Sequence, residues 1–397
     1  MQLIDFKKYD NNIKKKKLNR KKVVILTVVS VIVAILIIMS LIYIYNKDFR
    51  NIIDTYVLRK EVEENNGPII ELSSQIDSNN IIAYDRYVGI LDKSILNIYS
   101  SNGKKDKELE VEISNCIYDS ENRFLVMAEK DGQKITFIYG TDIVWKNTVD
   151  GTISNIFVNE NGYVSVITKG TTYNNVVIIY NPDGTELFKS FLSKTMAVDA
   201  EISNDNKYLA IAEIDTSGSF VQSNVKILSM EKAQTDPENS TEYIYPAESD
   251  EILIALEYQD NDKLICMYDD SIHVIENNTD TKLVDISDNK NTFADIGLDN
   301  HIVEVVEKSS GLFADVDVEI TEINTNKKSI YTVESAINSL KAKSNVIAIN
   351  LGTEIHFIDT NGWLIKKYNS TMEAKDILLG TNIAAIVFSD KIEIVNI

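Results

Sequence analysis

The sequence predicts an all-β protein, a WD40- or quinoprotein-like β-propeller of eight blades, preceded by one transmembrane α-helix. Two observations lead to this prediction. A pair of apolar segments recurs through residues 67–397 at a mean spacing of about 42 residues, the length of one four-stranded blade. Residues 23–45 carry no charged side chain and are long enough to cross a bilayer. A ring of seven blades is the alternative.

The chain begins with a basic arm, residues 1–22, which contains nine Lys or Arg and two Asp. The uncharged segment 23–45 follows and ends without a small-residue cleavage pattern, so we expect an anchor and not a removed signal peptide. Basic clusters beside a span stay in the cytoplasm. We therefore predict a single-pass cell-membrane protein with a cytoplasmic N-terminus and an extracellular propeller. A fully buried core helix is the alternative for 23–45.

Residues 46–66 show helical periodicity, with apolar side chains at Phe49, Ile52, Ile53, Tyr56 and Val57. Gly67 and Pro68 end this pattern, because neither continues a helix well. The segment is too short for a dimerising coiled coil. We interpret it as an amphipathic stalk helix before the propeller domain, residues 67–397.

Eight apolar segments share a polar or small first residue followed by a strand pattern: 86–91, 123–128, 162–167, 207–212, 263–268, 301–306, 345–350 and 382–387. A second strand follows each of them: 95–99, 135–139, 176–180, 225–228, 272–275, 316–320, 355–358 and 392–395. We interpret the two series as the second and third strands of eight blades, counted outward from the channel.

Turn residues support this order. Asn102-Gly103, Asp183-Gly184 and Asn361-Gly362 each come just after a third strand, where a tight hairpin needs a positive φ angle. The eighth repeat ends with the chain and lacks an outermost strand. We expect residues 68–72 to supply it and so to close the ring. The longest insertion, 229–242, is expected to be a flexible exposed loop.

Charge restricts the function. The chain has 60 Asp or Glu against 40 Lys or Arg, a formal net charge of −20, and residues 51–397 alone carry −28. Nucleic acid and anionic lipid headgroups both favour positively charged protein surfaces. The composition therefore excludes nucleic acid as a partner.

Motifs for catalysis and for cofactors are absent. There is no G-x-S-x-G elbow and no phosphate-binding Gly-rich loop, and His273, His301 and His356 lack the spacing of a zinc site. We assign no catalytic residue, no cofactor and no metal. Asp315, Asp317 and Glu319, which alternate along one strand face, are weak candidates for Ca²⁺, with a solvated strand edge as the alternative.

Two hypotheses for function remain. The first is a non-catalytic extracytoplasmic binding or scaffold module for a protein or cell-envelope component. The second is a cell-envelope enzyme with a carboxylate-based site at the channel mouth. For the first we expect the partner on the loops between second and third strands, 170–175, 216–223 and 309–314, with Tyr173, Phe220 and Phe313 as aromatic anchors. These aromatic side chains could instead pack onto their own blades.

Several segments resemble a known family: 57–62, 133–138, 143–145, 202–213 and 267–273. They are similar to a clostridial family of single-pass membrane proteins with an extracytoplasmic β-propeller, the domain-of-unknown-function family numbered fifty-seven eleven. The resemblance covers nearly the whole chain. It implies a low-GC anaerobic source and the same topology, and it carries over no activity or catalytic residue.

The predicted orientation can be tested with intact protoplasts. Protease added outside should digest residues 68–397, because the basic arm before residue 23 keeps only the N-terminus in the cytoplasm. Immunoblotting of the C-terminal region measures the outcome. Protection of this region until the cells are lysed would show that the orientation is reversed.

Overall fold

The structure is a computed structural model, and it describes residues 20–45, 53, 67–72, 76–248, 251–286, 291–307 and 315–397. Contacts divide the chain into two compact units, residues 1–60 and 61–397. Most of the predicted basic arm and, apart from position 53, the predicted stalk at 46–66 lie outside the described residues.

Among the described residues of the first unit, α1 (Arg20–Tyr45) forms a helix that begins three residues before the apolar segment predicted from the sequence. Most of its described side chains between Val28 and Ile44 are exposed. Within the described part of the chain, no helix qualifies by length and apolar content as a membrane span. The transmembrane segment therefore stays a prediction of the sequence.

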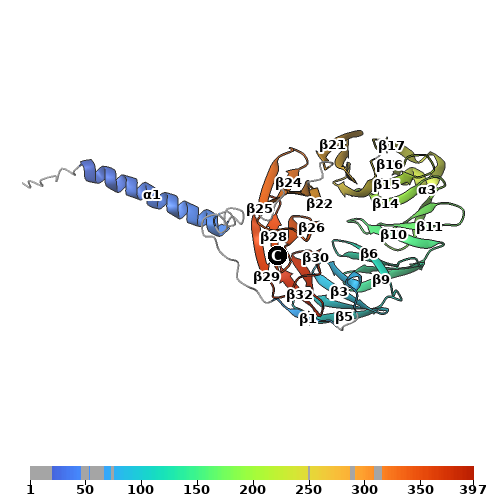
Figure 1. Cartoon of the computed structure of the whole chain (residues 1–397), viewed down its shortest axis with the longest axis horizontal. Helices are drawn as coiled ribbons and strands as arrows, with labels where there is room; N and C mark the ends of the chain where they lie inside the picture. The colour runs from blue at the N-terminus through green and yellow to red at the C-terminus, as the bar shows by residue number, and fades with distance from the viewer. Residues whose placement is uncertain are drawn as a thin grey trace, which may run out of the picture. The chain divides into compact units, whose positions relative to one another are not determined.

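The second unit is an eight-bladed all-β propeller, which confirms the predicted fold class and the higher blade count. Eight four-stranded antiparallel sheets follow one another around a ring in chain order (Figure 1). Blades 1 and 2 contain β2 (Ile81–Tyr84), β3 (Tyr87–Asp92), β4 (Ile95–Ser100) and β5 (Lys105–Glu110), then β6 (Cys116–Glu121), β7 (Phe124–Glu129), β8 (Lys134–Tyr139) and β9 (Asp142–Thr148). Blades 3 and 4 contain β10 (Thr152–Val158), β11 (Val164–Lys169), β12 (Asn175–Tyr180) and β13 (Glu186–Leu192), then β14 (Met196–Ile202), β15 (Tyr208–Asp215), β16 (Gln222–Ser229) and β17 (Thr241–Pro246).

The second half of the ring repeats the same plan. Blades 5 and 6 contain β18 (Leu253–Gln259), β19 (Lys263–Tyr268), β20 (Ser271–Glu276) and β21 (Thr279–Asp285), then β22 (Asn291–Leu298), β23 (His301–Glu307), β24 (Val316–Glu322) and β25 (Lys328–Val333). Blades 7 and 8 contain β26 (Ser339–Lys343), β27 (Val346–Asn350), β28 (Glu354–Asp359) and β29 (Leu364–Asn369), then β30 (Asp376–Gly380), β31 (Ile383–Val387) and β32 (Lys391–Asn396). The two series read from the sequence are the second and third strands, as predicted.

Blade 8 takes its outermost strand from the other end of the domain. β1 (Ile69–Glu71) pairs antiparallel with β32, and Ile70 lies opposite Ile392. A Cβ atom on Gly67 would lie 1.9 Å from the carbonyl oxygen of Ile394, so this close approach requires glycine. The predicted closure by residues 68–72 is therefore present, and it removes an open sheet edge.

The hydrophobic core is divided into eight clusters, each between two neighbouring blades. A middle strand therefore buries side chains on both of its faces. In β31 all five residues, Ile383–Val387, are buried. This explains why the repeated segments are continuously apolar and do not alternate with polar residues.

Local sequence explains the turns and one departure from expectation. Gly103, Gly184 and Gly362 have φ angles of 75°, 86° and 75°, as the hairpin prediction required.

The insertion 229–242, expected to be a flexible loop, instead contains α3 (Met230–Thr235) and the 3₁₀ turn η3 (Pro237–Asn239). The side chain of Ser229 caps α3 by accepting a hydrogen bond from the amide of Lys232, and the helix buries Met230. The loop prediction was wrong because it weighed Asp236-Pro237 and overlooked this N-cap.

Ring closure can be tested at two adjacent positions on β1. Ile70 is 5% exposed, so Ile70→Ala leaves a cavity between blades 8 and 1 and should cost about 2–4 kcal/mol of unfolding free energy. Ile69 is 47% exposed and provides the matched control, with an expected change within about 0.5 kcal/mol for Ile69→Ala. Denaturant unfolding of the full chain measures both values. Equal stability of the two variants would mean that β1 does not hold the ring closed.

Candidate functional site

The central channel opens into a cavity of about 340 Å³ on one face of the propeller. It lies at the C-terminal ends of six innermost strands: β6, β10, β14, β18, β22 and β26. Its lining comes from residues 119–121, 158–160, 201, 202, 204, 257–260, 297, 299, 300, 343 and 344. We call this cavity the channel mouth. It opens on the face that carries the turns between first and second strands.

Negative charge dominates the channel mouth. Seven of its lining residues are carboxylates: Asp119, Glu121, Glu160, Glu201, Glu257, Asp260 and Asp299. One lining residue, Lys343 on β26, is cationic. Its Nζ donates a hydrogen bond of 2.9 Å to the backbone carbonyl of Ser120 on β6, so this side chain links blade 7 to blade 2. The lining as a whole keeps a large excess of negative charge.

Two aspartates beside the mouth connect neighbouring blades. Asp119 on β6 accepts a hydrogen bond of 2.8 Å from the amide of Val158 on β10. Asp199 on β14 accepts one of 2.8 Å from the amide of Leu256 on β18. Each also accepts a hydrogen bond from the amide that follows it in the chain. Burial raises the pKa of both carboxyls, that of Asp199 to about 7, although the backbone donors favour the ionised form. Both aspartates are therefore structural links.

Two glutamates are placed differently. Glu201 lies two residues beyond Asp199 on β14 and projects from the same strand face, and Glu257 occupies β18 of the next blade. Neither forms a hydrogen bond or ion pair with any residue in the described part of the chain. Burial raises the pKa of both well above the ordinary value, and neighbouring carboxylates raise it further. These side chains are available to a ligand in the mouth.

The acidic residues predicted from the sequence lie elsewhere, in blade 6. Asp315 is exposed and precedes β24, whereas Asp317 is buried and accepts a hydrogen bond of 2.6 Å from the hydroxyl of Thr332. Glu319 forms an ion pair of 2.7 Å with Lys328. No group of three or more His, Cys, Asp or Glu among the described residues is arranged to hold a metal ion. Calcium binding at this strand stays a prediction of the sequence alone.

Two of the three predicted aromatic anchors, Tyr173 and Phe220, lie among the described residues. Tyr173 is 37% exposed and its ring lies 4.8 Å from that of Phe191 in the same blade, between centroids. It lines a cavity of about 550 Å³ with residues 196–198 and Thr216, on the face opposite the channel mouth. Phe220 is 73% exposed and does not line this cavity. Phe313 lies outside the described residues.

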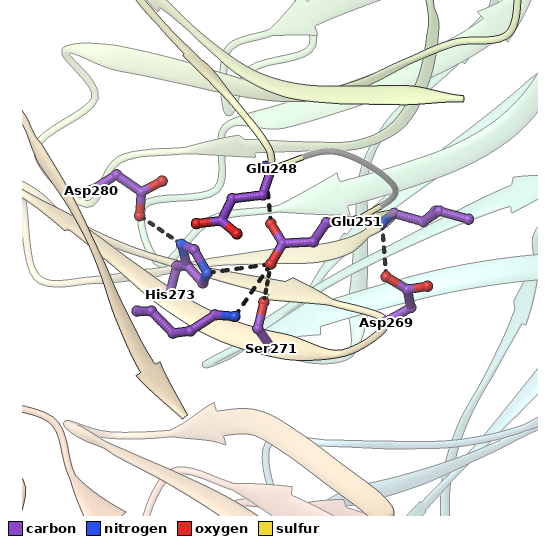
Figure 2. A network of polar contacts seen from close by, with 8 residues as sticks. Glu248, Glu251, Asp269, Ser271, His273 and Asp280 are labelled. Atoms are coloured by element: carbon purple, nitrogen blue, oxygen red, sulfur yellow. Dashed lines mark hydrogen bonds and ion pairs between the residues drawn. The ribbon is translucent and has the colours of Figure 1, made fainter. Parts of the chain in front are cut away.

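A buried histidine network joins the start of blade 5 to its outer strands (Figure 2). Nδ1 of His273 lies 2.9 Å from Oδ1 of Asp280, and Ser271 donates a hydrogen bond of 3.1 Å to Oε1 of Glu251. The residue types are those of a hydrolytic triad. However, the Ser271 hydroxyl donates to Glu251 and not to His273, and Ser271 is fully buried. The network therefore has a structural role, because a triad nucleophile must be held by the histidine and reach a substrate.

Sequence reasoning missed the residues of the channel mouth. They lie on the innermost strands, which were not part of the two repeated series. A signal was present, because Glu121, Glu201 and Glu257 each come two to six residues before a repeated segment, at 123, 207 and 263. An acidic residue near the end of the innermost strand in three blades indicates that these side chains gather at one end of the channel.

The half-buried glutamates Glu201 and Glu257 should make stability depend on pH. Their pKa is raised in the folded state, so between pH 4.5 and that raised value the folded chain binds more protons than the unfolded chain. Stability therefore falls as the pH rises through this window. The double variant Glu201→Gln, Glu257→Gln removes both titrating carboxyls. Its Tm should be higher than that of the wild type at pH 8 and nearly the same at pH 4.

Exposed Glu110 at the end of β5 provides the matched control. Glu110→Gln should leave Tm unchanged at both pH values. Differential scanning calorimetry of the full chain measures the three proteins. A double variant with the same Tm as the wild type at pH 8 would show that the two carboxyls are not destabilising there.

Comparison with solved structures shows the fold. The C-terminal WD40 domain of Sif2 is 12% identical, with a TM-score of 0.56, and the match covers 85% of this chain and 99% of that one. Sqt1 from Chaetomium thermophilum, solved bound to the N-terminus of the ribosomal protein L10, is 9% identical, with a TM-score of 0.53, covering 84% and 100%. BamB from Moraxella catarrhalis is 10% identical, with a TM-score of 0.49, covering 83% and 100%. No curated protein matches the sequence.

A protein family, described as a family of unknown function (DUF5711), matches residues 38–397. The match contains the whole propeller and all five segments that suggested this resemblance. The predicted family is therefore confirmed, and the chain belongs to the DUF5711 family. The clostridial source and the single membrane pass stay predictions.

Proposed function

We propose that this protein is a membrane-anchored, extracytoplasmic binding module whose channel mouth takes a positively charged ligand. One observation carries the proposal: seven carboxylates and one ammonium line a single cavity of about 340 Å³ at the centre of a rigid ring. Opposite charges at about 4 Å attract by roughly 4 kcal/mol where the effective dielectric constant is near 20. A cation in the mouth would meet several such partners, whereas an anion would be repelled.

Proton binding and ligand binding should be linked at this site. The carboxyl groups of Glu201 and Glu257 have a raised pKa because they are buried near other carboxylates. A bound cation favours their ionised form and therefore lowers that pKa. By linkage, the affinity for a cation should rise as the pH rises above 4.5, the ordinary value, because these carboxyls then lose their protons.

The anchor is proposed from the sequence and from the first unit of the chain. Residues 23–45 are uncharged and follow a basic arm, as in spans with a cytoplasmic N-terminus. In α1 most described side chains are apolar and exposed, which suits contact with lipid. In this arrangement the acidic propeller lies outside the membrane, where the cationic groups of a protein, a cell-envelope component or a small molecule can reach the mouth.

A carboxylate-based enzyme at the same mouth is the second candidate, and the raised pKa of Glu201 and Glu257 favours it. A carboxyl that stays protonated near neutral pH can serve as a general acid. Binding is preferred because such an enzyme also needs an ionised carboxylate or another base in a defined position. Asp119 and Asp199, the nearest aspartates, use their oxygens for backbone hydrogen bonds between blades.

Calorimetric titration of the full chain in detergent tests the binding proposal. Hexaamminecobalt(III), a compact cation that needs no metal ligand from the protein, and spermidine serve as cationic probes, and pyrophosphate serves as the anionic one. At pH 8 both cations should bind and pyrophosphate should not. The variant Glu121→Gln, Glu201→Gln, Glu257→Gln should lose at least about tenfold in affinity for each cation, which corresponds to about 1.4 kcal/mol.

The exposed Glu110→Gln variant again provides the control and should bind as the wild type does. Weaker binding of the cations at pH 5 than at pH 8 is also expected. Pyrophosphate binding at the mouth, or cation binding that the triple variant retains in full, would contradict the proposal.

A further inference from the structure

A second cavity, of about 220 Å³, lies between blades 4 and 5. Four tyrosines form much of its wall: Tyr208, Tyr243, Tyr245 and Tyr258. Apolar side chains from β16, β19 and β20 complete it, and its rim includes residues 261 and 262 and residues 277 and 278. Residues 261 and 262 belong to the turn between the first and second strands of blade 5. We call this cavity the tyrosine pocket, and it opens on the same face as the channel mouth.

Tyr258 belongs to both cavities. It lies on β18, between Glu257 and Gln259, and it lines the channel mouth as well as the tyrosine pocket. The residue is 9% exposed, and its hydroxyl makes no hydrogen bond to any residue that the structure describes. The hydroxyl oxygen is not among the fully enclosed polar atoms without a partner, so it is open to the cavities, where water or a ligand can satisfy it. The two cavities therefore adjoin at a polar atom that is available to a ligand.

The channel mouth and the tyrosine pocket offer different chemical groups to a ligand. The mouth offers carboxylates, which bind ammonium groups through charge-assisted hydrogen bonds. The pocket offers aromatic faces, which attract cations within about 6 Å and also bury methylene groups. The rings of Tyr243 and Tyr245 lie 6.2 Å apart, and Tyr243 is 38% exposed, so a thin aliphatic chain can reach them.

Other ligand classes fit the pair of cavities less well. The negative charge of the mouth excludes phosphorylated or carboxylated ligands. A neutral sugar could stack on the tyrosines, but it would leave the adjacent carboxylates without a charge partner. A compact metal ion would use the mouth and not the tyrosine pocket.

We propose that the channel mouth and the tyrosine pocket form one site for a linear polyamine. Ammonium groups occupy the mouth near Glu201 and Glu257, and the methylene chain passes Tyr258 into the tyrosine pocket. Together the two cavities fall within the range of about 300–1,000 Å³ typical of small-molecule sites. This inference rests on the proposed function, because it names the ligand of the same acidic mouth.

Titration with spermidine and with hexaamminecobalt(III) separates the polyamine inference from the proposed cation site. Tyr243→Ala in the full chain should weaken spermidine binding about tenfold, since it removes an aromatic face, and should leave the affinity for hexaamminecobalt(III) unchanged. Tyr258→Phe keeps the ring and removes the hydroxyl, and it should weaken spermidine binding by a smaller factor of about three to ten. Tyr139, 42% exposed on blade 2, provides the matched control, and Tyr139→Ala should bind both probes normally.

Each outcome decides between the ideas. If Tyr243→Ala and Tyr258→Phe both bind spermidine as the wild type does, while the triple Gln variant loses it, the cation site stands and the polyamine inference is wrong. If the wild type binds neither spermidine nor hexaamminecobalt(III), the cation site and the polyamine inference are both wrong. If a trilysine peptide binds at least tenfold more tightly than spermidine and is weakened by Tyr243→Ala, the ligand is a lysine side chain of a protein and the polyamine inference is again overturned.

Discussion

Closure of the ring is the constraint on which the rest of this structure depends. Each blade buries its two faces only against its neighbours, in eight separate clusters, so no blade has a complete core of its own. The strand pair β1 and β32 joins the first and last parts of the domain, and Ile70 packs with residues of both blade 8 and blade 1. If this pair opens, two blade faces lose their partners. The position of every inner strand, and with it the channel mouth, follows from this closure.

The repeat was readable from the sequence because of where the second and third strands lie. They are buried on both faces, so they give continuous apolar segments, and the turns after the third strands carry glycine where φ is positive. The innermost strands give no such pattern. They face the channel with polar residues, and several are interrupted by irregular pairing, as at Ala197 and Asp199. Helix α3 was missed for a different reason: the start of this short helix depends on one N-cap residue, Ser229, and that residue was overlooked.

The functional residues were hidden from sequence reasoning for the same physical reason. Glu121, Glu201 and Glu257 come from three blades and are far apart in the chain, and only the ring brings them to one cavity. The acidic residues that do cluster in sequence, Asp317 and Glu319, are matched locally by Thr332 and Lys328. A search for acidic residues close together in sequence therefore found carboxylates that have hydrogen-bond or ion-pair partners in the fold. The carboxylates of Glu201 and Glu257, which have no such partner, could be identified only from the structure.

The mouth and its immediate surroundings combine two kinds of carboxylate with different tasks. Asp119 in the lining and Asp199 beside it accept backbone hydrogen bonds from the next blade and hold the inner strands in register. Glu201 and Glu257 have no such partner and are kept close to other carboxylates, which makes the folded chain less stable as they ionise. Gln, which is close to Glu in shape and carries no charge, would avoid this destabilisation. Carboxylates that weaken the fold when they ionise are typical of a functional site. A bound cation would remove the repulsion, so the site would be most stable when occupied.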